Sequence, residues 1–413
     1  MKSTIKILLQ TKSPLHIAHP DNMRMTQEGA VTWGDKIKTF PCTAIQKMKI
    51  MVPPVNSESS SDNASEGVNA DTAPKNQRKS ATAYHAISFP VIASNNLAGR
   101  MRRHAAKHVL EAIKAKGQKV SLHAYSILMT GASTGRPDSD NLTYAEHVQS
   151  RSDPYFGLFG GGPKMFRRNM IVHPTLPITK ETTKLKGSMA HPLASDNIQA
   201  GIRGEGDYTL VHGFRHLDDL NSLANVELAS ATIENFENAL LNRQSKILTD
   251  KSVRAAKANG EEADGESDGR NSAATYSSIE FVVPGVIWDM TMELNVKTQA
   301  QVGLFLETLD SFAANERLGG YVRNGFGVFE MLNVVMENEN SEPVQIFQNG
   351  RLNRAEDTVA VALDAWQAAA KLIDVESIEK LLYVVSDDDR KAKATAKKTK
   401  KAVAALEAEA AGE

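Results

Sequence analysis

A glycine-rich segment at residues 319–330 constrains the fold of this chain most. It reads Gly-Gly-Tyr-Val-Arg-Asn-Gly-Phe-Gly-Val-Phe-Glu and stands at the start of an apolar run. Because glycine tolerates positive φ and leaves its backbone amides uncovered, the chain can turn sharply here and approach a ligand closely. Uncovered amides beside a cation suit a phosphate group, although glycine loops also serve as plain turns. The segment therefore predicts a turn that leads into a strand, with a phosphate contact as the functional alternative.

Composition bounds the class of protein. The chain has 413 residues, 41% of them apolar, which is enough for a well-filled core in one large domain or a few small ones. Lys+Arg 48 against Asp+Glu 49 leaves a net charge of −1, so any basic surface must be local. The single cysteine, Cys42, excludes a disulfide framework, and no apolar run approaches the roughly 18 residues of a membrane span. We expect a globular, cytoplasmic protein without a membrane segment.

Apolar periodicity predicts an α+β fold. Residues 3–12 alternate between apolar and polar side chains as an opening strand, which Ser13 and Pro14 end. The other predicted strands lie at 85–92, within 276–295 on either side of a bend at Pro284-Gly285, and at 325–336. The predicted helices lie at 94–116, 225–256, 298–316 and 357–383.

Several stretches break this periodicity. Residues 54–82 and 257–275 are polar and predict disordered insertions, and residues 386–413 predict a charged, flexible tail. Residues 172–215 are rich in Pro, Gly, Thr and Lys, so they favour an extended arm over a packed element. Because the insertions interrupt apolar segments that make sense only together, we expect residues 1–385 to form a single domain.

The helix predicted at 94–116 has a cationic face. Ser94, Asn95 and Asn96 are N-cap candidates at its amino end, where free amides and the helix dipole favour an anion. Only Glu111 opposes the cations of this face, so it is either a solvated surface or a phosphate site. Those cations are Arg100, Arg103, Lys107 and Lys114.

Residues 153–168 interleave aromatic rings, three consecutive glycines and cations, in the order Asp-Pro-Tyr-Phe-Gly-Leu-Phe-Gly-Gly-Gly-Pro-Lys-Met-Phe-Arg-Arg. Such a pattern suits single-stranded nucleic acid, because bases stack on rings while cations neutralise phosphates. A buried, close-packed turn is the structural alternative. An NTPase P-loop does not fit, because Pro163 separates Gly162 from Lys164 and Met165 stands where a Mg²⁺-binding Ser or Thr belongs.

Catalytic and metal-binding patterns are sparse. His212 and His216 lie four residues apart, without the glutamate of a helical zinc motif. No Gly-x-Ser-x-Gly elbow occurs. We therefore expect no catalytic residue, no metal and no cofactor.

Three segments in chain order carry a resemblance to a known family: the first strand with residues 13–17, the strand-to-helix passage at 89–103, and the glycine-rich loop at 319–327. With these segments the chain resembles the RAMP superfamily of CRISPR effector complexes, whose core is a modified RNA-recognition-motif (RRM) fold. Together with residues 153–163, the pattern is most similar to the crRNA-binding backbone subunit of type IV complexes, type IV-A in particular.

The resemblance implies an RRM-like (ferredoxin-like) palm with a finger-like insertion at 20–50 and a thumb-like arm at 172–215. It implies that copies line up as a helical filament along guide RNA (crRNA), hold its phosphates and sugars, and leave the bases to pair with target nucleic acid in defence against viruses and plasmids. The implied partners are a guide-processing endoribonuclease, the subunit that caps the 5′ end of the guide, a large subunit and a DinG-type helicase.

One departure concerns catalysis. The resemblance implies that type III backbone subunits cut target RNA with an aspartate after the first strand. Asp21 and Asp35 lie in that region here, but neither stands in a matching context. We expect a non-enzymatic subunit. A RAMP-type endoribonuclease that uses His16 or Asp35, and an interaction protein that binds no RNA, stay open as alternatives.

These patterns together name the candidate RNA-binding residues. They are Asn95, Asn96, Arg100, Arg103, Lys107, Phe159, Gly161, Gly162, Lys164, Arg167, Arg168, Arg203, Arg323, Asn324, Gly325 and Phe326.

Overall fold

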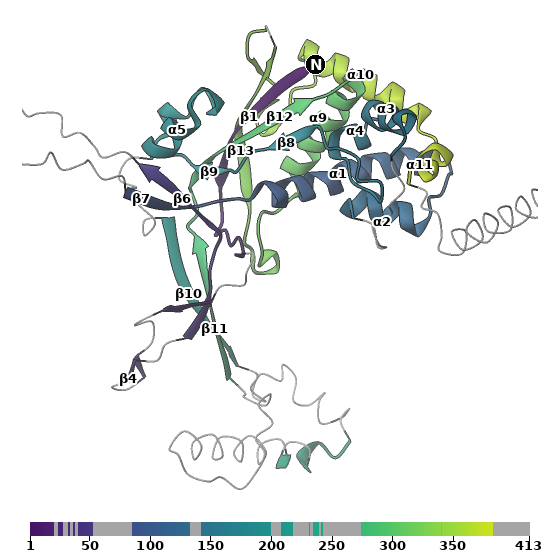
Figure 1. Ribbon diagram of the computed structural model, residues 1–413. Helices are drawn as coiled ribbons and strands as arrows, with labels where there is room; N and C mark the ends of the chain where they lie inside the picture. The colour runs from purple at the N-terminus through teal and green to yellow at the C-terminus, as the bar shows by residue number, and fades with distance from the viewer. Residues whose placement is uncertain are drawn as a thin grey trace, which may run out of the picture. The chain divides into compact units, whose positions relative to one another are not determined.

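The computed structural model describes residues 1–19, 24–27, 32–33, 36–37, 40–52, 85–132, 142–199, 208–217, 231, 234–238, 241–242, 274–339 and 341–382. The chain forms two compact units (Figure 1). The first unit comprises Met1–Leu15, Lys47–Asp207 and Pro284–Glu413, and the second comprises His16–Gln46 and Tyr208–Val283. The predicted insertion at 54–82, most of the helix predicted at 225–256, and the tail at 386–413 lie outside the described residues. So do residues 257–273 of the insertion predicted at 257–275, whose last two residues begin a strand instead.

An antiparallel sheet organises the first unit. In chain order its main elements are β1 (Lys2–Thr11), α1 (Ser94–Ala115), β8 (Met170–Val172), β12 (Ile287–Asn295), α9 (Gln299–Asn315) and β13 (Phe329–Asn338). In space the strands run β13-β1-β12-β8, with the short strands β14 (Val344–Gln345) beside β13 and β9 (Leu176–Pro177) beside β12. The order βαββαβ with the first and third strands at the centre is the ferredoxin-like arrangement. The predicted RRM-like α+β fold is confirmed.

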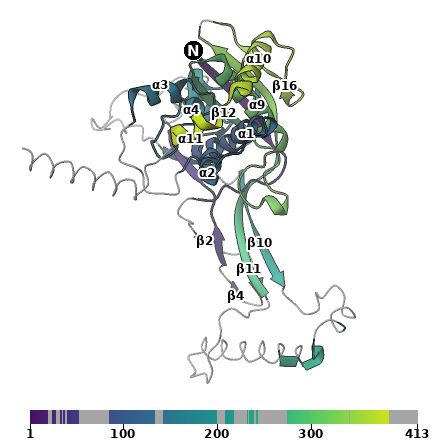
Figure 2. The same cartoon turned by 90° about the vertical axis from the view of Figure 1, so that its right-hand side faces the viewer.

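Helices cover one face of this sheet. Ile5, Ile7 and Leu9 of β1 are fully buried and point to one face, because side chains alternate along a strand. The helical layer on that face runs α10 (Asp357–Leu372), α9, α1 and α2 (Leu122–Thr130) in both views (Figures 1 and 2). Three shorter helices complete it: α3 (Tyr144–Ser152), α4 (Phe156–Phe159) and α11 (Val375–Leu382).

Helix α1 begins at Ser94, as predicted, but none of the proposed N-cap residues occupies the N-cap position. Its N-cap is Ala93, which offers no capping side chain, so Asn95 and Asn96 lie inside the first turn. The predicted end at Gly117 is confirmed, because Gly117 takes φ +67° directly after the C-cap Lys116. Helix α9 begins at a capping box in which Thr298 and Gln301 exchange hydrogen bonds.

A packed segment covers the other face of the sheet. It consists of α5 (Lys180–Lys186) and two short 3₁₀ turns, η1 (Gly187–Met189) and η2 (Ser195–Asn197). Leu8 of β1 packs there against Ile178 and Ala194. The extended arm expected across 172–215 is therefore wrong for residues 180–199. The sheet face on which an RRM could stack bases is covered by this segment.

Buried ion pairs fasten that segment. Lys186 Nζ lies 3.0 Å from Asp289 Oδ1, and Lys6 Nζ donates to the Ser188 carbonyl at 2.8 Å and to Glu337 Oε1 at 2.7 Å. Burial lowers the pKa of the Lys186 ammonium, against the opposing effect of the nearby Asp289 carboxylate. Each ammonium retains a carboxylate partner, which offsets part of the desolvation cost.

The remaining described strands form smaller sheets. In the first unit, β6 (Lys47–Val52) pairs with β7 (His85–Pro90), and β15 (Phe347–Gln348) pairs with β16 (Arg351–Leu352). The second unit contains a sheet with the order β10-β11-β5-β2, made of Thr209–Leu217, Ala274–Val282, Phe40–Thr43 and Arg24–Gln27, and a small pair of β3 (Thr32–Trp33) with β4 (Lys36–Ile37). The described strands of the region 20–46 thus belong to the second unit. No helix in the described parts of the chain is long and apolar enough to cross a membrane.

Candidate nucleic-acid interface

The end of β1 and the glycine-rich loop are bound to each other. Gly327 donates its amide to the Pro14 carbonyl at 2.9 Å, and Lys12 donates its amide to the Val328 carbonyl at 2.8 Å. Val328 in turn donates its amide to Ser13 Oγ at 2.9 Å. Ser13 and Val328 are 315 residues apart in the sequence. Two distant segments of the chain therefore meet and form one edge of the fold.

Arg100 fastens the amino half of α1 to the same loop. Its guanidinium donates to Glu316 Oε1 at 2.7 Å, to the Gly319 carbonyl at 2.7 Å and to the Arg317 carbonyl. It also receives support from Asn96 Oδ1, which accepts from Arg100 Nε at 2.8 Å. With 15% of its side chain exposed, Arg100 is committed to internal carbonyls, so the phosphate role predicted for it and for Asn96 does not fit.

Glu316 is the charged centre of this junction. It accepts from Arg100 and lies with Oε2 3.2 Å from His104 Nε2. Burial opposes its ionisation, but the hydrogen bonds from His104 and the Arg317 amide and the charge of Arg100 together lower the pKa of the Glu316 carboxyl to about 2. The carboxylate is therefore ionised throughout the neutral range and holds α1 against the end of α9.

The tip of the loop is exposed. Val322–Asn324 form a 3₁₀ turn between Tyr321 and Gly325, both in the left-handed region at φ +56° and +82°. Arg323 and Asn324 point to solvent, and nothing lies within 4 Å of a Cβ built on Gly325. Phe326, predicted as a contact, is only 8% exposed, whereas Tyr321 is 40% exposed. Sequence reasoning missed Tyr321, although an aromatic residue within a glycine run is a recognisable signal.

Gly327 has a different task from Gly325. A Cβ on Gly327 would lie 1.9 Å from the Leu318 carbonyl oxygen, and its φ is +81°. Leu318 also donates its amide to the Gly327 carbonyl at 2.9 Å. Gly327 thus closes the base of the loop, and Gly325 shapes the exposed tip.

The second glycine-rich segment is a buried turn. Phe159 is 1% exposed and Phe166 is 4% exposed, so neither ring can stack on a base. Gly161 and Phe166 exchange backbone hydrogen bonds at 3.0 Å. A Cβ on Gly160 would lie 2.3 Å from the Phe166 carbonyl oxygen. The structural alternative for residues 153–168 is therefore the correct one at these positions.

Two cations around this turn bind groups of the protein itself. Arg102 donates to the carbonyls of Phe159 and Gly160 and lies 5.8 Å from the centre of the Phe159 ring. Lys164 forms an ion pair with Glu146 at 2.5 Å, and this hydrogen bond is the main cause that lowers the pKa of Glu146 to about 2. Arg167 is exposed and Arg168 is half-buried. The role of Arg102 was not readable from the sequence, since it stands in a run of similar cations.

The predicted cationic face of α1 lines a groove. Arg103, Lys107 and Lys114 are exposed and border a groove of about 360 Å³. Tyr125 and Met129 of α2 contribute to its lining. Lys107 lies 3.8 Å from Glu111, an exposed pair of the kind that contributes little free energy.

Other candidates fall elsewhere. Arg203, Asp21 and Asp35 lie outside the described residues. His16, the possible ribonuclease base, is 1% exposed with Nδ1 2.7 Å from the Glu280 carbonyl, a position that does not fit contact with a substrate. Within the described ranges, no group of three or more His, Cys, Asp or Glu side chains could hold a metal ion.

The sequence and the structure were compared with those of known proteins. No family model matches the sequence, and no curated protein matches it. Among solved structures, a similar chain belongs to one titled "Type IV-B CRISPR Complex", with 13% sequence identity and a TM-score of 0.40. The alignment covers 83% of this chain and 92% of that chain. The assignment of this chain to the RRM-like fold rests on its own strand order, β13-β1-β12-β8.

Proposed function

We propose that this protein is a crRNA-binding backbone subunit of a CRISPR effector complex, most like that of type IV. Several copies bind along one guide RNA, hold its phosphates and leave its bases to pair with target nucleic acid. The proposed role is non-enzymatic, and its partners are the other subunits of such a complex: a guide-processing endoribonuclease, a 5′-cap subunit, a large subunit and a DinG-type helicase.

One observation carries the proposal. The three segments that resemble the RAMP framework lie far apart in the sequence but meet at one edge of the RRM-like unit. Pro14 binds Gly327, and Arg100 of α1 binds Gly319. A shared framework would produce such a meeting, because residues that are used together must be close in space.

The chemistry at this edge suits a phosphate backbone. The exposed loop tip offers Arg323, Asn324 and the uncovered backbone at Gly325. The first turn of α1, which no side chain caps, adds the positive end of a 22-residue helix. These groups recognise phosphate and sugar and carry no base information, so binding at this edge is independent of guide sequence.

Contacts to the sheet face are not part of the proposal. Residues 180–199 are held over that face by the ion pair of Lys186 with Asp289 and by the hydrogen bond from Lys6 of β1 to the Ser188 carbonyl. RNA would then follow the loop edge of the unit. Bases that are not stacked on the protein stay available for pairing.

Binding measurements test the proposal. Purified protein is titrated with two labelled RNAs of equal length and unrelated sequence at several salt concentrations, and nucleic acid that co-purifies is identified. We expect equal affinities for the two RNAs and a log–log salt slope of about −0.7 for each phosphate contact. A strong preference for one sequence, or no RNA binding at low salt, contradicts the proposal. Cleavage of labelled guide or target RNA in Mg²⁺ would favour the ribonuclease alternative instead.

A further inference from the structure

Helix α10 carries an exposed stripe with no packing partner in the chain's described part. Val359, Ala362, Leu363 and Trp366 form its buried side. The opposite side, which we name the acidic stripe, is exposed: 59% of Val361 and 81% of Leu372 are accessible to solvent. Its members follow helical spacing along one face. They are Asp357, Val361, Asp364, Ala368 and Leu372.

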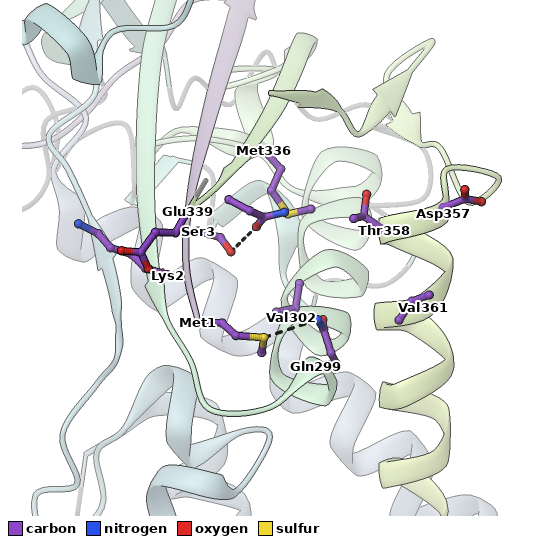
Figure 3. Close-up of a pocket in the computed structure, with 11 residues that line it drawn as sticks. Met1, Lys2, Ser3, Gln299, Val302, Met336, Glu339, Asp357, Thr358 and Val361 are labelled. Atoms are coloured by element: carbon purple, nitrogen blue, oxygen red, sulfur yellow. Dashed lines mark hydrogen bonds between the residues drawn. The ribbon is translucent and has the colours of Figure 1, made fainter. Parts of the chain in front are cut away.

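A hollow extends the acidic stripe at the amino end of α10. It encloses about 550 Å³ and has an apolar floor that includes Met1, Val302 and Met336 (Figure 3). Glu339 and Asp357 stand at its edge. Among the described lining side chains, the cation is Lys2, which lies 3.8 Å from Glu293. This end of α10 therefore presents apolar surface with an acidic border.

The groove between α1 and α2, here named the cationic groove, has the opposite character. Its floor is formed by Leu110, Tyr125 and Met129, and 45% of Tyr125 is exposed. Its border is formed by Arg103, Lys107 and Lys114, with Glu111 as the opposing charge. An apolar floor with a charged border is the usual anatomy of a protein interface. A single exposed ring among aliphatic side chains suits an amphipathic helix better than a run of stacked bases.

The two surfaces match in spacing. Lys107 and Lys114 are seven residues apart on α1, and Asp357 and Asp364 are seven residues apart on α10. Both pairs therefore span about 10.5 Å along their helices. If the helices run antiparallel, Lys114 meets Asp357 while Lys107 meets Asp364. Val361 then faces the apolar floor at Leu110.

The acidic stripe and the cationic groove do not pair within one copy. Helix α10 packs along α9 and reaches the end of α1, where Lys116 Nζ donates to the Ile373 carbonyl, and α2 lies beyond α1 (Figures 1 and 2). Among the described residues of one copy, Asp357 and Asp364 are exposed and form no ion pair with Lys107 or Lys114. A second copy can supply the complementary surface, and contact between two different surfaces repeats from copy to copy without closing unless the rotation forms a ring.

We propose that α10 of one copy docks antiparallel into the cationic groove of the next copy, with Asp357 and Asp364 on Lys114 and Lys107. This inference deepens the proposed function and rests on it for the RNA that the copies follow. The acidic hollow at the start of α10 receives the basic end of α1. Lys371 of α10 and Glu111 of α1 lie in the paired surfaces as well and set the register by opposing shifted alignments.

A charge exchange tests the docking. Variant one carries Lys107→Glu and Lys114→Glu, and variant two carries Asp357→Lys and Asp364→Lys. Self-association is measured by sedimentation without RNA, and then on a long RNA, beside wild-type protein. The control carries Lys180→Glu and Lys184→Glu, the same charge change on exposed positions of α5.

We expect each variant alone to associate about tenfold or more weakly than wild type, since like charges replace both ion pairs. An equal mixture of the two variants should regain wild-type association, because each then supplies the complement of the other. The control should match wild type. Higher salt should weaken wild-type association, since rim charges are screened.

Several outcomes overturn the inference. They are a wild-type protein that stays monomeric both free and on RNA, variants that associate like wild type, and a mixture that is not rescued. In parallel, the affinity for a short RNA that accepts one copy is measured for wild type, both variants and the control. If short-RNA binding persists while the charge exchange has no effect, the docking is wrong and the proposed function stands. If variant one loses short-RNA binding but associates normally, the groove is an RNA site and the docking is wrong.

Discussion

The guanidinium of Arg100 lies 2.7 Å from the carboxylate of Glu316, and this ion pair joins the first long helix to the start of the glycine-rich loop. The side chains are 15% and 17% exposed, so water screens the pair only partly. Arg100 extends the junction by binding the carbonyls of Arg317 and Gly319. An arginine that the sequence offers as a phosphate contact thus serves to position the loop that carries the exposed Arg323.

Removal of the carboxylate should reveal this role. Glu316→Gln should lower the free energy of unfolding at pH 7 by roughly 1.5–3 kcal/mol, since it leaves Arg100 without a charged partner. The pKa of Glu316 is lowered to about 2 from 4.5, so its contribution is complete above pH about 4.5 and is lost as pH falls through 2. The difference between wild type and variant, followed by denaturant unfolding, should therefore shrink on acidification from pH 5 to pH 2.

Glu330→Gln provides the matched control for that experiment. Glu330 pairs with Lys12 at 2.8 Å, but the two side chains are 50% and 43% exposed. An exposed pair of this kind is worth less than about 1 kcal/mol. If Glu330→Gln lowers the free energy of unfolding as much as Glu316→Gln does, the ion pair of Arg100 with Glu316 stabilises the fold no more than an exposed pair.

The regular elements of the fold were predictable because their periodicity is local. The alternation in residues 3–12 and the helical spacing in 94–116 correspond to β1 and α1 within one or two residues. The bend at Pro284-Gly285 separates β11 from β12 as predicted. Each of these signals depends only on residues close in the sequence, so it can be recognised without knowledge of tertiary contacts.

The site was less predictable, since its contacts are distant in the sequence. The pattern of rings, glycines and cations at 153–168 is the same for a stacking surface and for a buried turn, and only burial of Phe159 distinguishes them. Arg100 meets a partner 216 residues away, which no local pattern can indicate. Residues 180–199 were expected to be extended because the stretch is rich in Pro, Gly, Thr and Lys. Its buried residues include the polar Thr182 and His191, so no apolar periodicity indicates the packing.

The turn around Phe159 gives a second prediction. Arg102→Lys should lower the free energy of unfolding by roughly 1–3 kcal/mol, because a lysine cannot hold the carbonyls of both Phe159 and Gly160 in the same fork. Affinity for RNA should stay unchanged, since this turn is internal. Chemical unfolding and an RNA titration of the same preparation check both halves. If Arg102→Lys lowers RNA affinity but leaves the free energy of unfolding unchanged, residues 153–168 contribute to the RNA-binding surface after all.

The two glycines of the loop should respond differently to alanine. Gly327→Ala places a Cβ 1.9 Å from the Leu318 carbonyl, so the base of the loop must shift and thermal stability should fall sharply. Gly325→Ala meets nothing within 4 Å and should cost only about 1–2 kcal/mol for its positive φ. Thermal unfolding of the two variants measures the difference. Equal melting temperatures would contradict the division between a structural base and an exposed tip.

The loop tip decides the mechanism of RNA binding. Arg323→Ala should weaken RNA binding by roughly 1–3 kcal/mol and reduce the log–log salt slope by about 0.7, because one charge-assisted phosphate contact is lost. Gly325→Val should weaken binding further, since a branched side chain then stands where the backbone is uncovered. Lys180→Ala, an exposed cation on α5, is the matched control. If Arg323→Ala binds RNA with the affinity and salt slope of the control while both proteins remain folded, the guide does not follow the loop edge, and the proposed path of the RNA is wrong.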